Sequence, residues 1–291
     1  MTTPAPTPTR IGPTTFIWGD RTYVMGILNV TPDSFSGDGL ITGGDPLRAA
    51  LDQAKRMVDE GADLLDIGGE STRPGHAPVD AAEEIGRVIP IVAAVHDALP
   101  DVPLSIDTTK AVVAEAALSA GATLLNDVWG VGPDPAMAEL AASARVPLIV
   151  MHNRDEARYD DVVREVIGDL RRALDRGEQL GIRPEDLIVD PGIGFGKTAD
   201  HNVTLLRHLD ALTVLGRPIL LGTSRKSTIG RILDLPADER LEGTLATTAL
   251  GVASGVDIVR VHDVRANVRA ARVADAIVRG RWSSEPEGGG A

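Results

Sequence analysis

The sequence has 291 residues, no cysteine, and 42 acidic against 29 basic side chains, which give a net charge of −13. The lack of cysteine excludes a disulfide scaffold, a thiol nucleophile and a cysteine zinc site. The acidic balance disfavours nucleic acids and anionic membranes as partners, and at first sight it also disfavours an anionic substrate.

Both ends of the chain have the composition of solvated tails. Residues 1–14 begin with a Pro/Thr-rich segment that has no apolar region, so we expect no secretory signal, and residues 281–291 are rich in Ser, Glu and Gly. We therefore predict disordered tails over 1–14 and 281–291, around a single folded domain over 15–280. No apolar run reaches the roughly 18 residues of a membrane span, and we expect a cytoplasmic protein.

The first predicted element is a small β-hairpin, in which Thr15–Trp18 and Arg21–Tyr23 flank Gly19–Asp20. After it, eight short runs rich in apolar residues alternate with longer amphipathic segments. The runs are almost continuous in hydrophobicity, as expected of parallel strands buried on both faces. They lie at Val24–Leu28, Leu64–Ile67, Leu104–Ile106, Thr123–Leu125, Leu148–Met151, Leu187–Val189, Ile219–Leu221 and Ile258–Val261.

The segments between these runs have helical patterns. Residues 46–60 place apolar side chains on one stripe, with Asp45 as the N-cap before Pro46, and Gly61 follows as a C-cap signal. Seven repeats between residues 29 and 260 average 33 residues, which matches a βα unit of about 30. We predict an α/β fold, a TIM (β/α)8 barrel with the hairpin at its bottom. A doubly wound open sheet is the competing architecture.

Polar residues follow each predicted strand, at the end where such barrels build their active sites. One polar residue there is usually a helix N-cap, but eight in register, several of them too long to cap, indicate a functional face. These residues are Asn29, Asp66, Asp107, Asn126–Asp127, His152, Asp190, Ser224–Ser227 and Arg260–His262.

The chemistry of this face falls into two groups. Carboxylates and an amide suit a ligand edge with adjacent N–H donors, such as a 2-amino-4-oxo-pyrimidine ring. Cationic side chains suit an oxyanion, either phosphate or carboxylate. The first group is Asp107, Asn126 and Asp190, and the second is Arg73, Lys226, Arg260 and His262.

Three loops have unusual compositions. Residues 29–39 and 68–75 are rich in glycine and hydroxyl groups and are long enough to be lids. Residues 190–198 end like a phosphate loop, but Pro191 stands where that motif needs glycine, which excludes an ATPase. We predict instead that these glycines give the tight backbone that lets Phe195 lie over a flat ring.

The sequence offers little for a tight metal site. It has no His-Glu-x-x-His motif, and neither His152 nor His262 has a carboxylate partner at ligand spacing, so we expect no zinc. Asn29 together with phosphate oxygens of a substrate suits Mg²⁺, which accepts such mixed shells.

Taken together, these segments resemble dihydropteroate synthase, a pterin-binding family of folate biosynthesis. They run in the family's order over about residues 23–280. The matching segments are Asn29–Phe35, Asp66–Gly75, Ser105–Thr108, Asn126–Asp127, Met151–His152, Asp190–Lys197, Ser224–Ser227 and Arg260–His262. Two segments depart from the family's pattern: Asp38 follows Gly37 rather than standing directly after Ser36, and residues 153–156 differ from a common Met-Gln-Gly run.

The resemblance implies that 6-hydroxymethyl-7,8-dihydropterin diphosphate and 4-aminobenzoate are joined to 7,8-dihydropteroate, with release of pyrophosphate in an SN1-like substitution. It also implies a target of sulfonamides, without fixing the sensitivity of this chain to them, and a homodimer formed through residues 203–215 and 241–252. Residues that the resemblance places on the pterin are Asp107, Asn126, Met151, Asp190, Phe195 and Lys226. Those placed on the Mg²⁺-pyrophosphate end are Asn29, Arg260 and His262, and those on 4-aminobenzoate are Thr72, Arg73 and Ser227.

Asp190, Lys226 and the loop residue Asp33 are expected nearest the chemistry. Two alternatives stay open. A pterin-binding methyltransferase barrel shares the strand-end Asp and Asn residues but has no need of Ser224–Ser227 or Arg73. A catalytically degenerate pterin-binding paralogue predicts gaps in the loop motifs.

Overall fold

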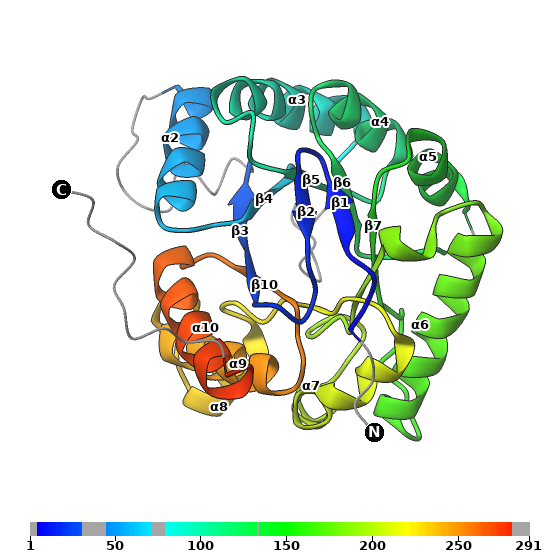
Figure 1. The fold of residues 1–291 in the computed structure, drawn as a ribbon, viewed down its shortest axis with the longest axis vertical. Coiled ribbons are helices and arrows are strands. Elements are labelled where there is room, and N and C mark those ends of the chain that lie inside the picture. The colour runs from blue at the N-terminus through cyan, green and yellow to red at the C-terminus, as the bar shows by residue number, and fades with distance from the viewer. Residues whose placement is uncertain (1–4, 31–44, 71–78, 133, 281–291) are drawn as a thin grey trace.

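The computed structural model describes residues 5–30, 45–70, 79–132 and 134–280 (Figure 1). Eight parallel strands in this part of the chain pair in the order β8-β7-β6-β5-β4-β3-β10-β9. A parallel bridge between Val189 and Ile219 joins the two ends of this order. The strands are β3 (Tyr23–Asn29), β4 (Leu64–Gly68), β5 (Leu104–Asp107), β6 (Leu124–Asp127), β7 (Leu148–Met151), β8 (Leu187–Asp190), β9 (Leu220–Leu221) and β10 (Ile258–Val261). The predicted TIM barrel is confirmed, and the open sheet is excluded.

Helices surround the strands on the outside of the ring (Figure 1). They are α2 (Pro46–Asp59), α3 (Ala81–Ala98), α4 (Ala111–Ser119), α5 (Ala136–Ala144), α6 (Val162–Gln179), α7 (Ala199–Arg207), α8 (Ser227–Leu233), α9 (Leu241–Ala253) and α10 (Val264–Val278). Short 3-10 turns lie at Pro184–Asp186, Leu209–Leu215 and Ala237–Glu239. The Asp45 side chain caps α2 as predicted, since it accepts a hydrogen bond from the amide of Leu47. Within the described ranges, no helix combines the length and apolar character that crossing a membrane requires.

Side chains alternate across each strand, so one set packs against the helices and the other fills the barrel. The outward set belongs to the larger apolar core. The inward set forms a second core with the apolar residues of the N-terminal hairpin. Its members are Ile11, Phe16, Trp18, Tyr23, Met25, Leu64, Leu124, Ile149, Ile188, Leu220 and Ile258.

The hairpin closes the lower end of the barrel, but it begins earlier than the sequence indicated. Its strands are β1 (Thr9–Ile11) and β2 (Thr14–Phe16), which pair antiparallel. The predicted hairpin around Gly19–Asp20 is therefore wrong, although the chain does turn there, and the predicted disordered tail is wrong at residues 9–11 and 14. The reason is that Ile11 and Phe16 are both fully buried in the barrel, and this contact fixes a chain whose composition resembles a tail. In Figure 1 the hairpin lies across the ring.

Candidate active site

The predicted polar face follows from the two-residue period of the strands. One step of two residues above the apolar barrel core, Leu64 is followed by Asp66, Leu124 by Asn126, Ile149 by Met151, Ile188 by Asp190 and Ile258 by Arg260. Residues at this spacing share a strand face, so they form a layer directly above the apolar core. The barrel thus presents a buried polar layer to its open end.

Arg260 connects the two groups of polar residues that the sequence analysis separated. Its Nε donates to Asp66 Oδ2 at 2.5 Å, and its Nη2 donates to Asp107 Oδ2 at 2.6 Å. Asn126 Nδ2 donates to the same Asp66 oxygen at 3.0 Å. Asp66 and Asp107 are both buried, so the guanidinium balances two carboxylates inside the barrel.

Burial changes the acidity of the carboxylates in this layer. It raises the pKa of Asp107 to about 7, against the opposing charge of Arg260. It raises the pKa of Asp190 to about 6, although the Gly192 amide donates to Asp190 Oδ1 at 2.7 Å. Asp107 Oδ1 is buried and has no hydrogen-bond partner among the described residues. Such carboxylates favour a ligand that brings N–H donors into the barrel.

Phe195 and Lys226 lie together beside this layer. Lys226 Nζ is 4.0 Å from the centroid of the Phe195 ring, which is a cation–π contact. Gly194 and Gly196 on either side of Phe195 have φ of +87° and +54°, a region that favours glycine. The glycines of this loop therefore allow the backbone turn that places Phe195 on the pocket; that its ring lies over a flat ligand stays a prediction.

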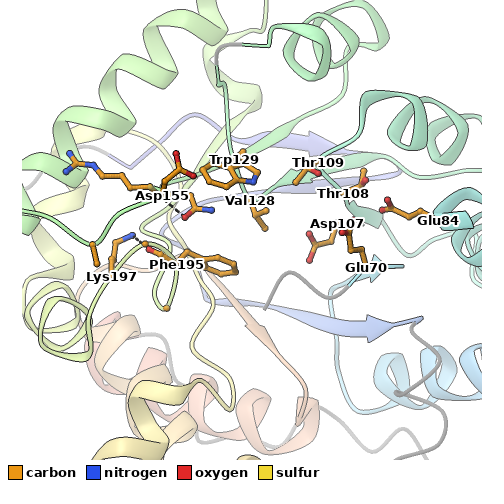
Figure 2. A pocket seen from close by; sticks show the side chains of 15 residues that line it. Glu70, Glu84, Asp107, Thr108, Thr109, Val128, Trp129, Asp155, Phe195 and Lys197 are labelled. Carbon is orange, nitrogen blue, oxygen red and sulfur yellow. Dashed lines mark hydrogen bonds between the residues drawn. The ribbon is translucent and has the colours of Figure 1, made fainter. Parts of the chain in front are cut away.

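A pocket of about 520 Å³ opens between Phe195 and Trp129 (Figure 2). Asp107 and Glu70 lie at one end of it and Lys197 lies at the other. The sequence analysis did not single out Trp129, Glu70 or Lys197. A sequence signal for Trp129 was present, because it is one of three tryptophans in the chain and follows the strand-end pair Asn126–Asp127 by two residues. In the structure its side chain is 49% exposed.

The loops after β9 and β10 meet at Ser224 and His262. The Ser224 hydroxyl is 2.9 Å from His262 Nδ1, and it accepts a hydrogen bond from the His262 amide at 3.1 Å. Arg225 next to it has φ of +58°, a strained conformation for a residue with a side chain, and it forms an ion pair with Asp263 at 2.7 Å. Ser227 begins α8 directly after Lys226.

Two polar strand-end residues turn away from the barrel. Asp127 and His152 each follow an inward-facing residue, so they point outward. Asp127 accepts a hydrogen bond from the Trp129 amide at 2.9 Å, and burial raises the pKa of Asp127 to about 7. His152 contacts Asp169 on α6 at 2.9 Å.

The structure brings most of the predicted site residues to one end of the barrel. Asn29 ends β3, where it lies in register with Gly68 of β4 at that same end. Three predicted residues, Asp33, Thr72 and Arg73, lie outside the described residues, as does Asp38. Among the residues described, no three or more acidic or histidine side chains are grouped to hold a metal ion. The single amide of Asn29 fits a Mg²⁺ that takes most of its ligands from water and phosphate.

Lys110 anchors the start of the second glycine-rich loop. Its Nζ is 2.5 Å from Glu70 Oε2 and 2.7 Å from Glu84 Oε2, and Glu84 is fully buried on α3. Glu70 Oε1 accepts a hydrogen bond from the Val79 amide at 3.1 Å. The Glu70 carboxylate therefore links the residue directly before residues 71–78 to Val79, the residue directly after them.

We expect Lys110→Met to lower the free energy of unfolding by about 2 kcal/mol, because it leaves the buried Glu84 without its cation. Urea denaturation measures this change. Arg48→Met is the matched control, since Arg48 lies 3.9 Å from Asp52 in an exposed pair and should change stability by less than about 0.5 kcal/mol. An equal loss in both variants would contradict the assignment.

Comparison with known proteins agrees with this architecture. The family model described as pterin binding enzyme matches residues 25–262, so the chain belongs to that family. Within it, the dihydropteroate synthase of Clostridium beijerinckii is 50% identical over 93% of this chain and 99% of the relative. The chain is accordingly a dihydropteroate synthase, a transferase of folate biosynthesis, and the methyltransferase alternative is set aside.

Solved structures give the same result. A dihydropteroate synthase from Clostridium difficile, in the presence of pteroic acid, has a TM-score of 0.86 and 52% identity. The match covers 91% of this chain and 99% of the Clostridium difficile chain. A Xanthomonas albilineans dihydropteroate synthase with 4-aminobenzoic acid has a TM-score of 0.86 and 43% identity, with 93% and 98% covered.

Proposed function

We propose that this site binds 6-hydroxymethyl-7,8-dihydropterin diphosphate in the barrel and transfers its pterin-methyl group to 4-aminobenzoate. The observation that carries the proposal is the buried layer of Asp107, Asn126 and Asp190 around Arg260. The ligands of the two solved relatives support it: pteroic acid is the oxidised form of the joined product, and 4-aminobenzoic acid is the amine substrate.

In this proposal the pterin edge lies on the carboxylates. Asp190 accepts from the adjacent N–H donors of the ring, and Asn126 and Asp107 complete the hydrogen bonds. Met151 lies at the end of β7, buried, and Phe195 flanks the pocket, so both are placed to contact the ring faces. Lys226 donates from the side of Phe195.

Arg260 and His262 take the diphosphate end, together with Asn29. A bound Mg²⁺ would supply charge neutralisation for the departing pyrophosphate. Thr72, Arg73 and Ser227 take 4-aminobenzoate, and Asp33 belongs to the loop that covers the reaction. These assignments rest on the sequence segments that resemble the family.

The reaction that fits these groups is an SN1-like substitution. The bond between the methylene carbon and the diphosphate oxygen breaks, and both electrons leave with pyrophosphate. The electron-rich dihydropterin carries the positive charge, which the Asp190 carboxylate stabilises. The amine lone pair of 4-aminobenzoate then forms the C–N bond, and its acidic anilinium proton passes to water. No general base is required.

A direct assay tests the function. We expect purified protein with the pterin diphosphate, 4-aminobenzoate and Mg²⁺ to release pyrophosphate and dihydropteroate in equal amounts, only when both organic substrates are present. A sulfonamide should compete with 4-aminobenzoate. Absence of release with all components, as a degenerate paralogue predicts, or release that ignores 4-aminobenzoate, would overturn the proposal.

We further propose a homodimer in the cytoplasm. Val214 and Leu250 lie in the two predicted contact regions, and Leu250 is 63% exposed. Ile277 lies on α10, which packs against α9, and is 78% exposed. Apolar side chains exposed together in this way suit a subunit interface.

For the dimer, we expect Leu250→Asp combined with Ile277→Asp to convert the protein to monomers in light scattering, because two buried charges would face the partner. Arg48→Asp on α2 is the control and should leave the mass unchanged. A monomeric native protein at micromolar concentration would contradict the proposal.

A further inference from the structure

Lys197 has no role in the chemistry described so far. It ends the Asp-Pro-Gly-Ile-Gly-Phe-Gly-Lys segment, where a phosphate loop would place a lysine that reaches a ligand. In the structure its side chain turns back onto its own loop. Figure 2 shows it beside Phe195 at the edge of the pocket.

The Lys197 ammonium gathers four acceptors. Its Nζ donates to the carbonyl oxygens of Gly192 and Phe195 at 3.0 Å each and to that of His152 at 3.3 Å. It also lies 2.8 Å from His152 Nδ1. Burial lowers the pKa of Lys197 to about 7, so these bonds are fully charge-assisted below that pH. Charge-assisted bonds are stronger than those of a neutral donor, and one of them holds the carbonyl of Phe195 itself.

His152 fixes this ammonium to the outer helices. Its Nε2 is 2.9 Å from Asp169 Oδ2 on α6, so Nε2 carries the proton and Nδ1 accepts from Lys197. Burial and the Lys197 charge lower the pKa of His152 to about 4, which keeps the imidazole neutral near pH 7. Arg154 also pairs with Asp169, at 2.7 Å.

The loop lies so close to the chain after β7 that only glycine fits at two positions. A Cβ on Gly192 would lie 1.9 Å from the His152 carbonyl oxygen, and one on Gly196 would lie 2.2 Å from that of Arg154. Both glycines have positive φ, +67° and +54°. The backbones therefore pack closely at this contact. Three carbonyl oxygens, those of His152, Gly192 and Phe195, converge on Lys197 Nζ there, and a cation among them offsets their mutual repulsion.

We infer that Lys197 is a positioning residue: its ammonium ties the Phe195 turn to His152 and so sets where the Phe195 ring meets the pterin. The inference rests on the proposed function for its effect on substrate. Its structural part, the hold on residues 192–196, stands on the contacts alone.

Lys197→Met tests the inference, since it keeps the length of the side chain and removes the donor. At pH 6, where Lys197 is charged and His152 is neutral, we expect the KM for the pterin diphosphate to rise about tenfold, as loss of charge-assisted bonds implies, while the KM for 4-aminobenzoate changes less than about twofold. Lys55→Met, on the exposed face of α2, is the matched control and should leave both values unchanged. Equal changes in the two KM values would overturn the inference.

A second pair of variants separates positioning from general damage. His152→Asn keeps an acceptor near the place of Nδ1 and should preserve most of the pterin affinity. His152→Leu removes the acceptor and should reproduce the Lys197→Met defect. If the two histidine variants behave alike, Lys197 does not act through His152, and the inference fails.

Hydrogen exchange provides a test that needs no substrate. The amides of Gly194 and Phe195 donate to Asn202 Oδ1 at 2.9 Å and to the Gly192 carbonyl at 3.1 Å. We expect both to exchange about tenfold faster in Lys197→Met than in the native protein. Unchanged exchange would overturn the inference even if turnover falls. If these amides exchange faster in Lys197→Met but the native protein has no synthase activity, the hold on the loop is supported and the proposed function is refuted.

Discussion

Replacing Asp190 by asparagine is expected to weaken pterin binding roughly 100-fold and, at pH 7.5, to stabilise the fold. Binding falls because the amide cannot offer two acceptor oxygens to the N–H donors of the ring. Stability rises because burial raises the pKa of Asp190 to about 6, so the native protein bears the cost of a buried charge above that pH. The oxygen that accepts from Gly192 is retained in the variant.

The sign of the effect follows from proton linkage. Between about pH 4 and 6 the native protein binds more protons at Asp190 than the unfolded chain does, so this residue's contribution to stability falls as pH rises. We therefore expect Asp190→Asn to gain on the order of 2 kcal/mol at pH 7.5 and to lose that advantage near pH 4. Urea denaturation at both pH values and fluorescence titration with a pterin measure the two effects. Asp200→Asn, on exposed α7, is the control, and intact pterin affinity in Asp190→Asn would contradict the site assignment.

Arg260→Met is expected to abolish turnover and to lower the free energy of unfolding by about 3–5 kcal/mol. The structure favours the second effect, because the guanidinium bonds Asp66 and Asp107, and its removal takes away the one cation hydrogen-bonded to both buried carboxylates among the described residues. The sequence analysis assigned Arg260 to the anionic end of the substrate. The contacts add a role in holding the carboxylate layer together.

The two roles of Arg260 can be separated. Asp66→Asn combined with Arg260→Met removes one carboxylate charge along with the cation, so much of the lost stability should return while turnover stays absent. Chemical denaturation and the pyrophosphate assay measure the two properties on the same samples. If stability fails to recover, the ion pair does not explain the loss. If turnover returns, Arg260 is not needed for the diphosphate.

The strands were predictable because strands buried on both faces of a parallel barrel have continuous apolar sequences. The polar layer was predictable because a polar residue follows each of these runs. The register was also present in the sequence: Ile188 and Asp190 share a face, and so do Ile258 and Arg260. The same period indicates that His152, one residue after the inward-facing Met151, points outward. The presence of a polar residue at a strand end did not by itself distinguish side chains that point into the barrel from those that point outward.

Other features depend on contacts between distant residues. Arg260 and Asp66 are 194 residues apart, and no local sequence pattern indicates that the guanidinium donates to two carboxylates within the barrel. The hairpin was misplaced because its two three-residue strands are stabilised by the barrel core, not by their own propensity. The acidic composition disfavoured an anionic substrate, but side chains close to a ligand outweigh charges beyond about 8 Å at physiological salt.

The hairpin that closes the lower end of the barrel limits the direction from which ligands reach the polar layer. Among the described residues, Ile11, Phe16 and Trp18 fill that end, so the polar layer faces the opposite end of the barrel, where the strands terminate. In the proposed reaction, both substrates enter and both products leave through this open end of the barrel. If the pterin binds in this layer and 4-aminobenzoate binds above it, as we propose, the pterin diphosphate enters first and the joined product leaves only once the opening is clear.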